Sequence, residues 1–158
     1  MTEISAAPLF YVDTNVFIAG FALDGLFVES AKQLFSALRQ KPCIAVTSEL
    51  TLAELLAPVK NPQAMPLALR TQIYGDLLLR SQIIKTRPVT RDILLETGGF
   101  RHAFPQKLPV AIHMVTALKE SCRFYITHDA DSRRMPQRLS AIRPDSVGVQ
   151  NITEILHA

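Results

Sequence analysis

The stretch that most constrains the fold is residues 8–17, where a short apolar run ends abruptly at an acid. Residues 9–12 are all apolar or aromatic, which is typical of a short buried strand. Asp13 follows directly, and Val16, Phe17 and Phe21 then recur at helical spacing. The segment therefore predicts a strand, an acidic turn and a helix. Open α/β sheets bind ligands at such turns, but Asp is also a common helix N-cap, so both interpretations stay open.

The chain has 158 residues, of which 48% are hydrophobic, so a single domain over residues 1–158 with a sizeable core is expected. No apolar run reaches the roughly 18 residues that a membrane span needs, and no secretory signal is visible. Cys43 and Cys122 lie in or beside apolar runs, which predicts reduced core thiols of a cytoplasmic protein, and they show no zinc-ligand spacing. The net charge of +3 permits a polyanionic partner without requiring one.

Strand and helix patterns alternate along the rest of the chain. Further strands are predicted at residues 43–47, 83–86, 124–126 and 146–149, and helices at residues 28–39, 48–57, 63–81, 90–98 and 109–118, with a short terminal helix capped by Asn151. Gly98 and Gly99 are expected to end or bend their helix, with a loop following over residues 100–107. This alternation predicts an α/β fold with a mostly parallel central sheet covered by helices on both faces, that is, a three-layer α/β/α sandwich.

The predicted helix over residues 48–57 carries one acid in an unusual setting. Leu52, Leu55 and Leu56 form its apolar stripe, while Glu54 lies on the other side among small or apolar residues. A merely solvated helix face usually carries several polar residues. Glu54 is therefore either an ordinary exposed glutamate or a functional carboxylate, and the pattern leaves both open.

The strand at residues 124–126 repeats the arrangement of the first one, because it runs directly into Thr127, Asp129 and Asp131. Carboxylates that follow neighbouring parallel strands converge at one sheet edge. Ordinary turn and capping chemistry is the alternative for both acids. The arginines that follow suit either a solvated face or nucleic-acid contact; they are Arg133, Arg134, Arg138 and Arg143.

The helix at residues 109–118 is apolar nearly all round, which predicts that it is buried. His113 lies within it. No second ligand stands at a metal-binding spacing, so we interpret His113 as a core histidine rather than a metal ligand or a base.

Four segments together resemble the PIN-domain family, and within it the VapC-type toxins of toxin–antitoxin pairs. They are Tyr-Val-Asp-Thr-Asn at 11–15, Thr-Ser-Glu-Leu-Thr-Leu-Ala-Glu at 47–54, Lys-Leu-Pro-Val-Ala-Ile-His-Met-Val-Thr-Ala-Leu at 107–118 and Phe-Tyr-Ile-Thr-His-Asp at 124–129. No single segment is specific; their order and spacing carry the resemblance. It covers most of the chain and implies a PIN-like fold, magnesium-dependent cleavage of an RNA substrate, a small antitoxin partner and a homodimer.

The resemblance also implies the roles of individual residues. Asp13, Glu54 and Asp129 match the family's catalytic acids, which bind Mg²⁺ or, alternatively, Mn²⁺. The residues that would orient ligands or water around them are Thr14, Asn15 and Thr127, with Asp131 where some members carry an extra acid.

One family acid is replaced in this chain. The buried helix typically opens Leu-Pro-Asp-Ala-Ile-His in the family, whereas here Val110 occupies the place of the aspartate. An acid there would be favoured by the helix N-terminus as well as by the metal, and Val110 gains from neither. Ion binding, and binding of a second ion above all, is therefore expected to be weaker.

Three functions stay open at this point. A toxin-like endoribonuclease, inhibited by an antitoxin, predicts metal-dependent RNA cleavage that stops when EDTA is added. A catalytically weakened PIN domain that acts as an RNA- or protein-binding module predicts salt-dependent RNA affinity with little turnover. The retained acids favour the first and Val110 favours the second. The third is an unrelated α/β domain whose caps and turns imitate a site.

Overall fold

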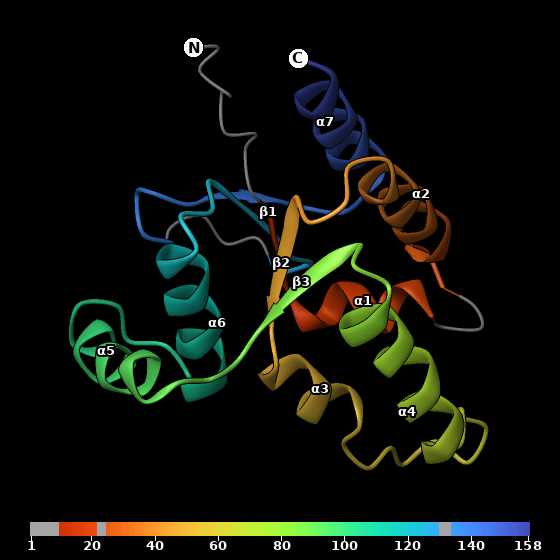
Figure 1. Ribbon diagram of the computed structural model, residues 1–158, viewed down its shortest axis with the longest axis horizontal. Coiled ribbons are helices and arrows are strands. Elements are labelled where there is room, and N and C mark those ends of the chain that lie inside the picture. The colour runs from red at the N-terminus through yellow and green to blue at the C-terminus, as the bar shows by residue number, and fades with distance from the viewer. Residues whose placement is uncertain (1–9, 22–24, 130–133) are drawn as a thin grey trace.

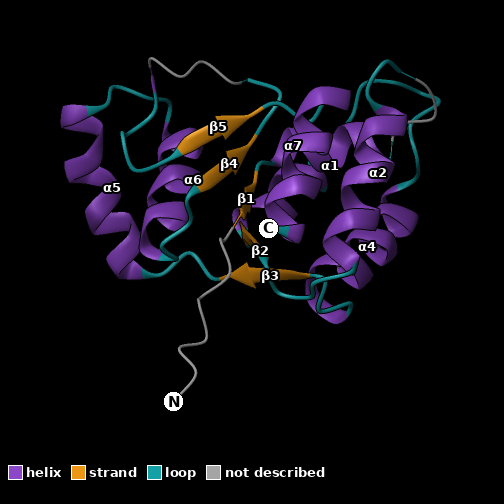
Figure 2. Ribbon diagram, turned by 90° about the horizontal axis from the view of Figure 1, so that it is seen from above, coloured by secondary structure: helices purple, strands orange, loops and turns teal. Residues whose placement is uncertain are grey.

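The structure, a computed structural model, describes residues 10–21, 25–129 and 134–158. Its centre is a five-stranded parallel sheet with the order β3–β2–β1–β4–β5, seen nearly edge-on in Figure 2. The strands are β1 (Phe10–Val12), β2 (Ala45–Ser48), β3 (Ile84–Arg87), β4 (Phe124–Ile126) and β5 (Ser140–Ile142). The predicted parallel sheet is thus confirmed.

Helices cover both faces of this sheet, so the predicted three-layer architecture is confirmed as well. The helices are α1 (Thr14–Gly20), α2 (Val28–Arg39), α3 (Leu50–Leu55), α4 (Leu67–Gly75) with the π-helical turn η1 (Asp76–Arg80), α5 (Arg91–Ala103), α6 (Leu108–Lys119) and α7 (Ser146–His157). Figures 1 and 2 show α5 and α6 on one face, with α1, α2, α4 and α7 on the other. None of the helices in the described part of the chain is long and apolar enough to cross a membrane.

The short strand β1 supplies both cores, because successive side chains of a strand point to opposite faces. Phe10 and Val12 pack into the larger core, which includes residues from α1, α2 and α7. Tyr11 points the other way and packs with Met114 of α6 and with Tyr125. All three β1 side chains are fully buried. A strand buried on both faces reads as a continuous apolar run, which is why it was visible in the sequence.

The strand order places a topological switch point beside β1. The chain adds β2 and β3 on one side of β1 and later adds β4 and β5 on the other side. Val12 lies in register with Ile126 of β4, and the Asp13 amide donates to the Ile126 carbonyl at 3.0 Å. The residues that follow β1 and β4 therefore emerge side by side, where open α/β sheets hold their ligands.

The predicted strand at residues 146–149 is wrong, because these residues begin α7 and the fifth strand lies earlier, at Ser140–Ile142. The Asp145 side chain caps α7 by accepting from the Gly148 amide at 2.8 Å. Asn151 consequently lies inside this helix rather than at its start. Val149, Ile152 and Leu156 are spaced by three and four residues and are buried in the larger core. A four-residue apolar run does not distinguish a strand from the first turn of such a helix.

Two further predictions need correction. Gly98 and Gly99 do not end their helix, because α5 continues to Ala103 and takes up the start of the expected loop. The predicted cap is confirmed, since the Thr90 side chain accepts from the Ile93 amide at 3.2 Å. Cys43 is exposed, with a positive φ of 65°, so it is not a core thiol, whereas Cys122 is buried as predicted; both thiols are free.

Candidate functional site

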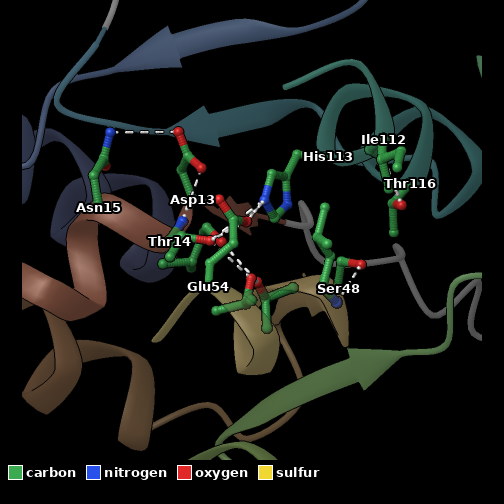
Figure 3. A network of polar contacts seen from close by, with 12 residues as sticks. Asp13, Thr14, Asn15, Ser48, Glu54, Ile112, His113 and Thr116 are labelled. Carbon is green, nitrogen blue, oxygen red and sulfur yellow. Dashed lines mark hydrogen bonds and ion pairs between the residues drawn. The ribbon is translucent and has the colours of Figure 1, made fainter. Parts of the chain in front are cut away.

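Asp13 ends β1 and caps α1, so its predicted capping role is confirmed. Its Oδ1 accepts a hydrogen bond from the Thr14 amide at 2.8 Å. Its Oδ2 accepts from the Thr127 hydroxyl at 2.8 Å and lies 3.4 Å from the Asn15 side-chain amide, as Figure 3 shows for Asn15. Both oxygens are held by the protein, which fixes the orientation of the carboxylate.

Asn15 joins the start of α1 to the loop that follows β4. Its side-chain amide donates to the Thr127 hydroxyl oxygen at 3.1 Å, and its carbonyl oxygen accepts from the His128 amide at 3.2 Å. The Thr127 oxygen also accepts from the Asp129 amide at 3.1 Å. These bonds hold the turn that carries Asp129 against the turn that carries Asp13. Asp129 itself is exposed, and Asp131 and Arg133 lie outside the described residues.

Glu54 reaches the same region from α3, on the β2 side of β1. Its Oε1 lies 2.5 Å from Nε2 of His113 and 3.0 Å from the Thr14 hydroxyl. Partial burial alone would raise the pKa of Glu54, but the His113 hydrogen bond and charge, with the Thr14 hydrogen bond, outweigh it and hold this pKa below its usual value. Glu54 is half-buried and its carboxylate is hydrogen-bonded, so it is not an ordinary exposed glutamate.

His113 is buried, as expected of a core histidine, yet it contacts one of the candidate acids. Its side chain is 2% exposed and reaches Glu54 through Nε2. Its Nδ1 lies 2.6 Å from the Tyr11 hydroxyl, and burial followed by the nearby Asp13 charge raises the pKa of Tyr11 well above its usual value. Sequence reasoning missed this role. The available signal was the spacing, because His113 lies one helical turn after Val110 and so shares its face.

A chain of buried hydroxyls lies behind Glu54, and sequence reasoning did not single out two of its members. The Thr47 hydroxyl donates to the Val12 carbonyl at 2.8 Å. Thr51 lies 2.9 Å from Thr47, and Thr14 lies 3.1 Å from Thr51. Because Thr47 has only one proton, Thr51 must donate to it. The chain ties β1, β2, α1 and α3 together, and the single proton of the Thr14 hydroxyl is shared between Thr51 and Glu54.

The candidate residues line one pocket of about 260 Å³. Asp13, Glu54 and Asp129 contribute its carboxylates, and Thr14, Asn15 and Thr127 contribute neutral polar groups. Val110, where the resemblance predicts a replaced acid, lines the same pocket. The other apolar lining residues are Ile18, Pro109, Met114 and Met135. The pocket is therefore acidic and polar on one side and apolar where α6 begins.

The oxygen atoms that line the pocket suit a hard cation in part. Carboxylate, hydroxyl and amide oxygens are the ligands that Mg²⁺ prefers, and it usually takes only one or two carboxylates while keeping several waters. Asp13 and Asp129 supply such a pair. Among residues 10–21, 25–129 and 134–158, no three His, Cys, Asp or Glu side chains are grouped closely enough to hold one ion. The site therefore fits a largely hydrated ion better than an ion enclosed by protein ligands.

Comparison with known proteins gives one family and several similar folds. The PIN domain family model matches residues 10–137, a span that contains every candidate residue named above. VapBC2 from Rickettsia felis, bound to a DNA fragment from its promoter, is 14% identical, with 85% of this chain and 98% of that chain covered and a TM-score of 0.65. No curated protein matches the chain.

Two further solved structures are similar. A toxin–antitoxin complex from Klebsiella pneumoniae is 21% identical, with 82% of this chain and 93% of that chain covered and a TM-score of 0.53. FitAB bound to an IR36 DNA fragment is 13% identical, with 86% and 95% covered and a TM-score of 0.58. At such identities the likeness establishes the shared fold.

Proposed function

Because the chain belongs to the PIN-domain family, we propose that it is a cytoplasmic, magnesium-dependent endoribonuclease of the VapC toxin type, weakened by Val110. PIN domains are generally nucleases. The observation that supports the proposal best is the convergence of Asp13, Glu54 and Asp129 on one pocket at the switch point of the sheet. This convergence supports the assignment of the three residues as the catalytic acids, and Val110, proposed to replace the fourth, lines the same pocket.

Asp13 and Asp129 would hold the cation, with Mn²⁺ as an alternative to Mg²⁺, and Glu54 adds a third negative charge. A bound ion of this kind supplies an activated water and stabilises charge that builds up on a phosphate. Thr127 and Asn15 keep Asp13 in one orientation through their hydrogen bonds to its Oδ2. The apolar wall at Val110 removes charge from the pocket and so weakens ion binding, which lowers but does not abolish activity.

Basic groups beside the pocket favour an RNA substrate. Arg134 lines the pocket together with Gln106. Gln106 also lines a second, more open depression whose basic groups are Arg101, His102 and Lys107. A polyanionic strand that passes from one depression to the other would leave its phosphates near these cations. Arg101 is already oriented there, because its Nε donates to the Gln106 carbonyl at 3.0 Å.

A small antitoxin is the protein partner that this function requires. A mostly apolar groove of about 740 Å³ joins the pocket, since Ile18 and Glu54 line both, and it continues past Phe21, Leu69 and Ile73. An amphipathic antitoxin segment suits such a groove. The homodimer expected of this type would use other surfaces, and sedimentation of the purified chain tests that stoichiometry directly.

A second candidate is an RNA- or protein-binding module without turnover, and the observation that favours it is Val110. The first turn of α6 contains no acid, although a helix N-terminus stabilises one. This candidate shares the basic surface and the groove with the first. The two differ only in whether RNA is cut.

The test is cleavage of a mixed RNA pool by the purified chain, with Mg²⁺ or with EDTA. We expect slow cleavage with Mg²⁺, none with EDTA, and none by Asp13→Asn, because this variant loses a ligand charge while keeping a side chain of the same shape. Cleavage that survives Asp13→Asn would contradict the proposed site. RNA binding without any cleavage by the wild type would favour the binding module.

A further inference from the structure

The buried imidazole of His113 lies between two polar groups from different elements, and Figure 3 shows it pointing toward Glu54. Nδ1 is 2.6 Å from the Tyr11 hydroxyl of β1, and Nε2 is 2.5 Å from Oε1 of Glu54 in α3. A carboxylate is an acceptor, so Nε2 carries a proton whether the ring is neutral or charged. With only 2% of its surface exposed, the ring is fixed by packing and donates to one oxygen of Glu54.

The same oxygen of Glu54 is held from a second direction. The Thr14 hydroxyl lies 3.0 Å from Oε1, and the Thr14 side chain is itself buried. The donors to Asp13 are different groups, namely the Thr14 amide and the side chains of Asn15 and Thr127 near β4. Thr14 of α1 contacts both carboxylates, but the other donors differ, because Glu54 is held by His113 of α6 and Asp13 by Asn15 and Thr127. This arrangement agrees with the lack, within the described ranges, of three acids or histidines grouped around one point.

We propose that His113 is a positioning residue that keeps Glu54 out of direct contact with a divalent cation, which is bound directly by Asp13 and Asp129 alone. The inference deepens the proposed metal-dependent function and rests on it. With Val110 in place of the family acid, Asp13 and Asp129 are the direct ligands that residues 10–21, 25–129 and 134–158 supply, a number that Mg²⁺ accepts. Glu54 acts as a nearby charge, and loss of the His113 donor releases it toward the ion.

The experiment measures Mn²⁺ binding to the purified full chain without RNA, by following the electron paramagnetic resonance signal of free Mn²⁺. Asp13→Asn removes a direct ligand and is expected to weaken binding at least about tenfold. Glu54→Gln removes only a nearby charge and is expected to weaken binding less than about threefold. The difference between these two variants distinguishes a direct ligand from an indirect one.

His113→Leu fills the buried space but removes the donor. We expect it to strengthen Mn²⁺ binding about threefold or more, because Glu54 becomes available to the ion. The gain should vanish when His113→Leu is combined with Glu54→Gln, since His113 acts through Glu54. Thr116→Val is the control: it removes a buried hydroxyl from the same helix whose bond is to the Ile112 carbonyl, and it should leave affinity unchanged. Damage to the fold would weaken binding, so it does not imitate a gain.

Two results would overturn the inference while leaving the proposed function intact. One is Glu54→Gln weakening Mn²⁺ binding as much as Asp13→Asn does. The other is His113→Leu leaving affinity unchanged or lowering it. A wild-type chain that binds no Mn²⁺ contradicts the proposed function itself, and this inference with it.

Discussion

At the scale of single residues, Val110 has a packing role in a place that would suit an acid. It lies in the first turn of α6, where the helix dipole favours a negative charge. The valine is half-buried and packs against the core cluster of Tyr11, Met114 and Tyr125. Apolar contact with that cluster stabilises the helix start without helping to bind a cation. Val110 therefore adds an apolar contact but no charge to the pocket.

The two cysteines give a prediction at the same scale, because their surroundings differ. Burial, followed by the nearby Glu120 charge, raises the pKa of Cys122 to about 12. Burial disfavours the charged thiolate, so at about pH 8 only roughly one Cys122 thiol in ten thousand is ionised. We expect iodoacetamide to label the exposed Cys43 at that pH and to leave Cys122 unlabelled, as read by mass spectrometry.

Both cysteines should be labelled once the chain is unfolded in urea, which serves as the control. Reactivity of Cys122 in the folded chain should rise only as the pH approaches its raised pKa. Equal labelling rates for Cys43 and Cys122 in the folded chain would show that Cys122 is not shielded.

At the scale of elements, the sequence was most informative where one pattern dominated. The helix over residues 28–39 and the strand over residues 124–126 have the predicted bounds, because amphipathic spacing and a bounded apolar run are local signals. The start of α7 was mistaken for a strand because its cap and its packing against the larger core decide the structure there. Local pattern alone did not contain that tertiary information.

The candidate site shows the same limit of local sequence patterns. Asp13, Glu54 and Asp129 line one pocket, and each was recognisable from its place after a strand or within a helix. The contact between His113 and Glu54 joins residues 59 positions apart. It depends on how α6 packs against the sheet at β2, which no local pattern encodes. The spacing placed His113 on the same helix face as Val110, but it did not show that Glu54 would meet His113 there.

Two glycines in different helices give a testable prediction about the stability of these helices. A Cβ on Gly148 in α7 would come within 1.7 Å of the Arg143 carbonyl oxygen, which is backbone and does not yield easily. Gly148→Ala is therefore expected to lower the free energy of unfolding by about 1–3 kcal/mol. Gly98 is also helical, but a Cβ there would meet nothing within 4 Å. Gly98→Ala should raise stability by about 0.5–1 kcal/mol.

Urea denaturation followed by circular dichroism measures both glycine variants. The pair separates crowding from helix propensity, since both variants make the same chemical change within a helix. Equal effects of the two substitutions would contradict the close packing of α7 against residue 143.

At the scale of the whole molecule, basic side chains lie on both sides of the sheet, but only one group of them lies next to the pocket. The basic depression of Arg101 and Lys107 lies at the end of α5, next to the pocket. Lys32 and Arg39 are exposed on α2, which covers the opposite face of the sheet (Figure 1). A net charge of +3 would attract RNA weakly to any basic surface. Position relative to the pocket, rather than total charge, should decide productive binding.

The double variants Arg101→Ala/Lys107→Ala and Lys32→Ala/Arg39→Ala lose the same charge on opposite faces. We expect the first to reduce the slope of log affinity for RNA against log salt by about 1 to 2, because up to two phosphate contacts are lost. The second should leave that slope unchanged. Fluorescence anisotropy with labelled RNA in EDTA measures binding without cleavage. Equal changes in both variants would indicate non-specific attraction.

The proposed function rests on a nuclease site that retains three acids and lacks a fourth. The most direct measurement is the single-turnover cleavage rate of a mixed RNA pool in Mg²⁺ for the wild type, Val110→Asp and Asp13→Asn. We expect slow cleavage by the wild type, at least about tenfold faster cleavage by Val110→Asp because a further carboxylate strengthens ion binding, and none by Asp13→Asn. Cleavage at equal rates by all three chains, or no cleavage by any of them, would contradict the proposed function.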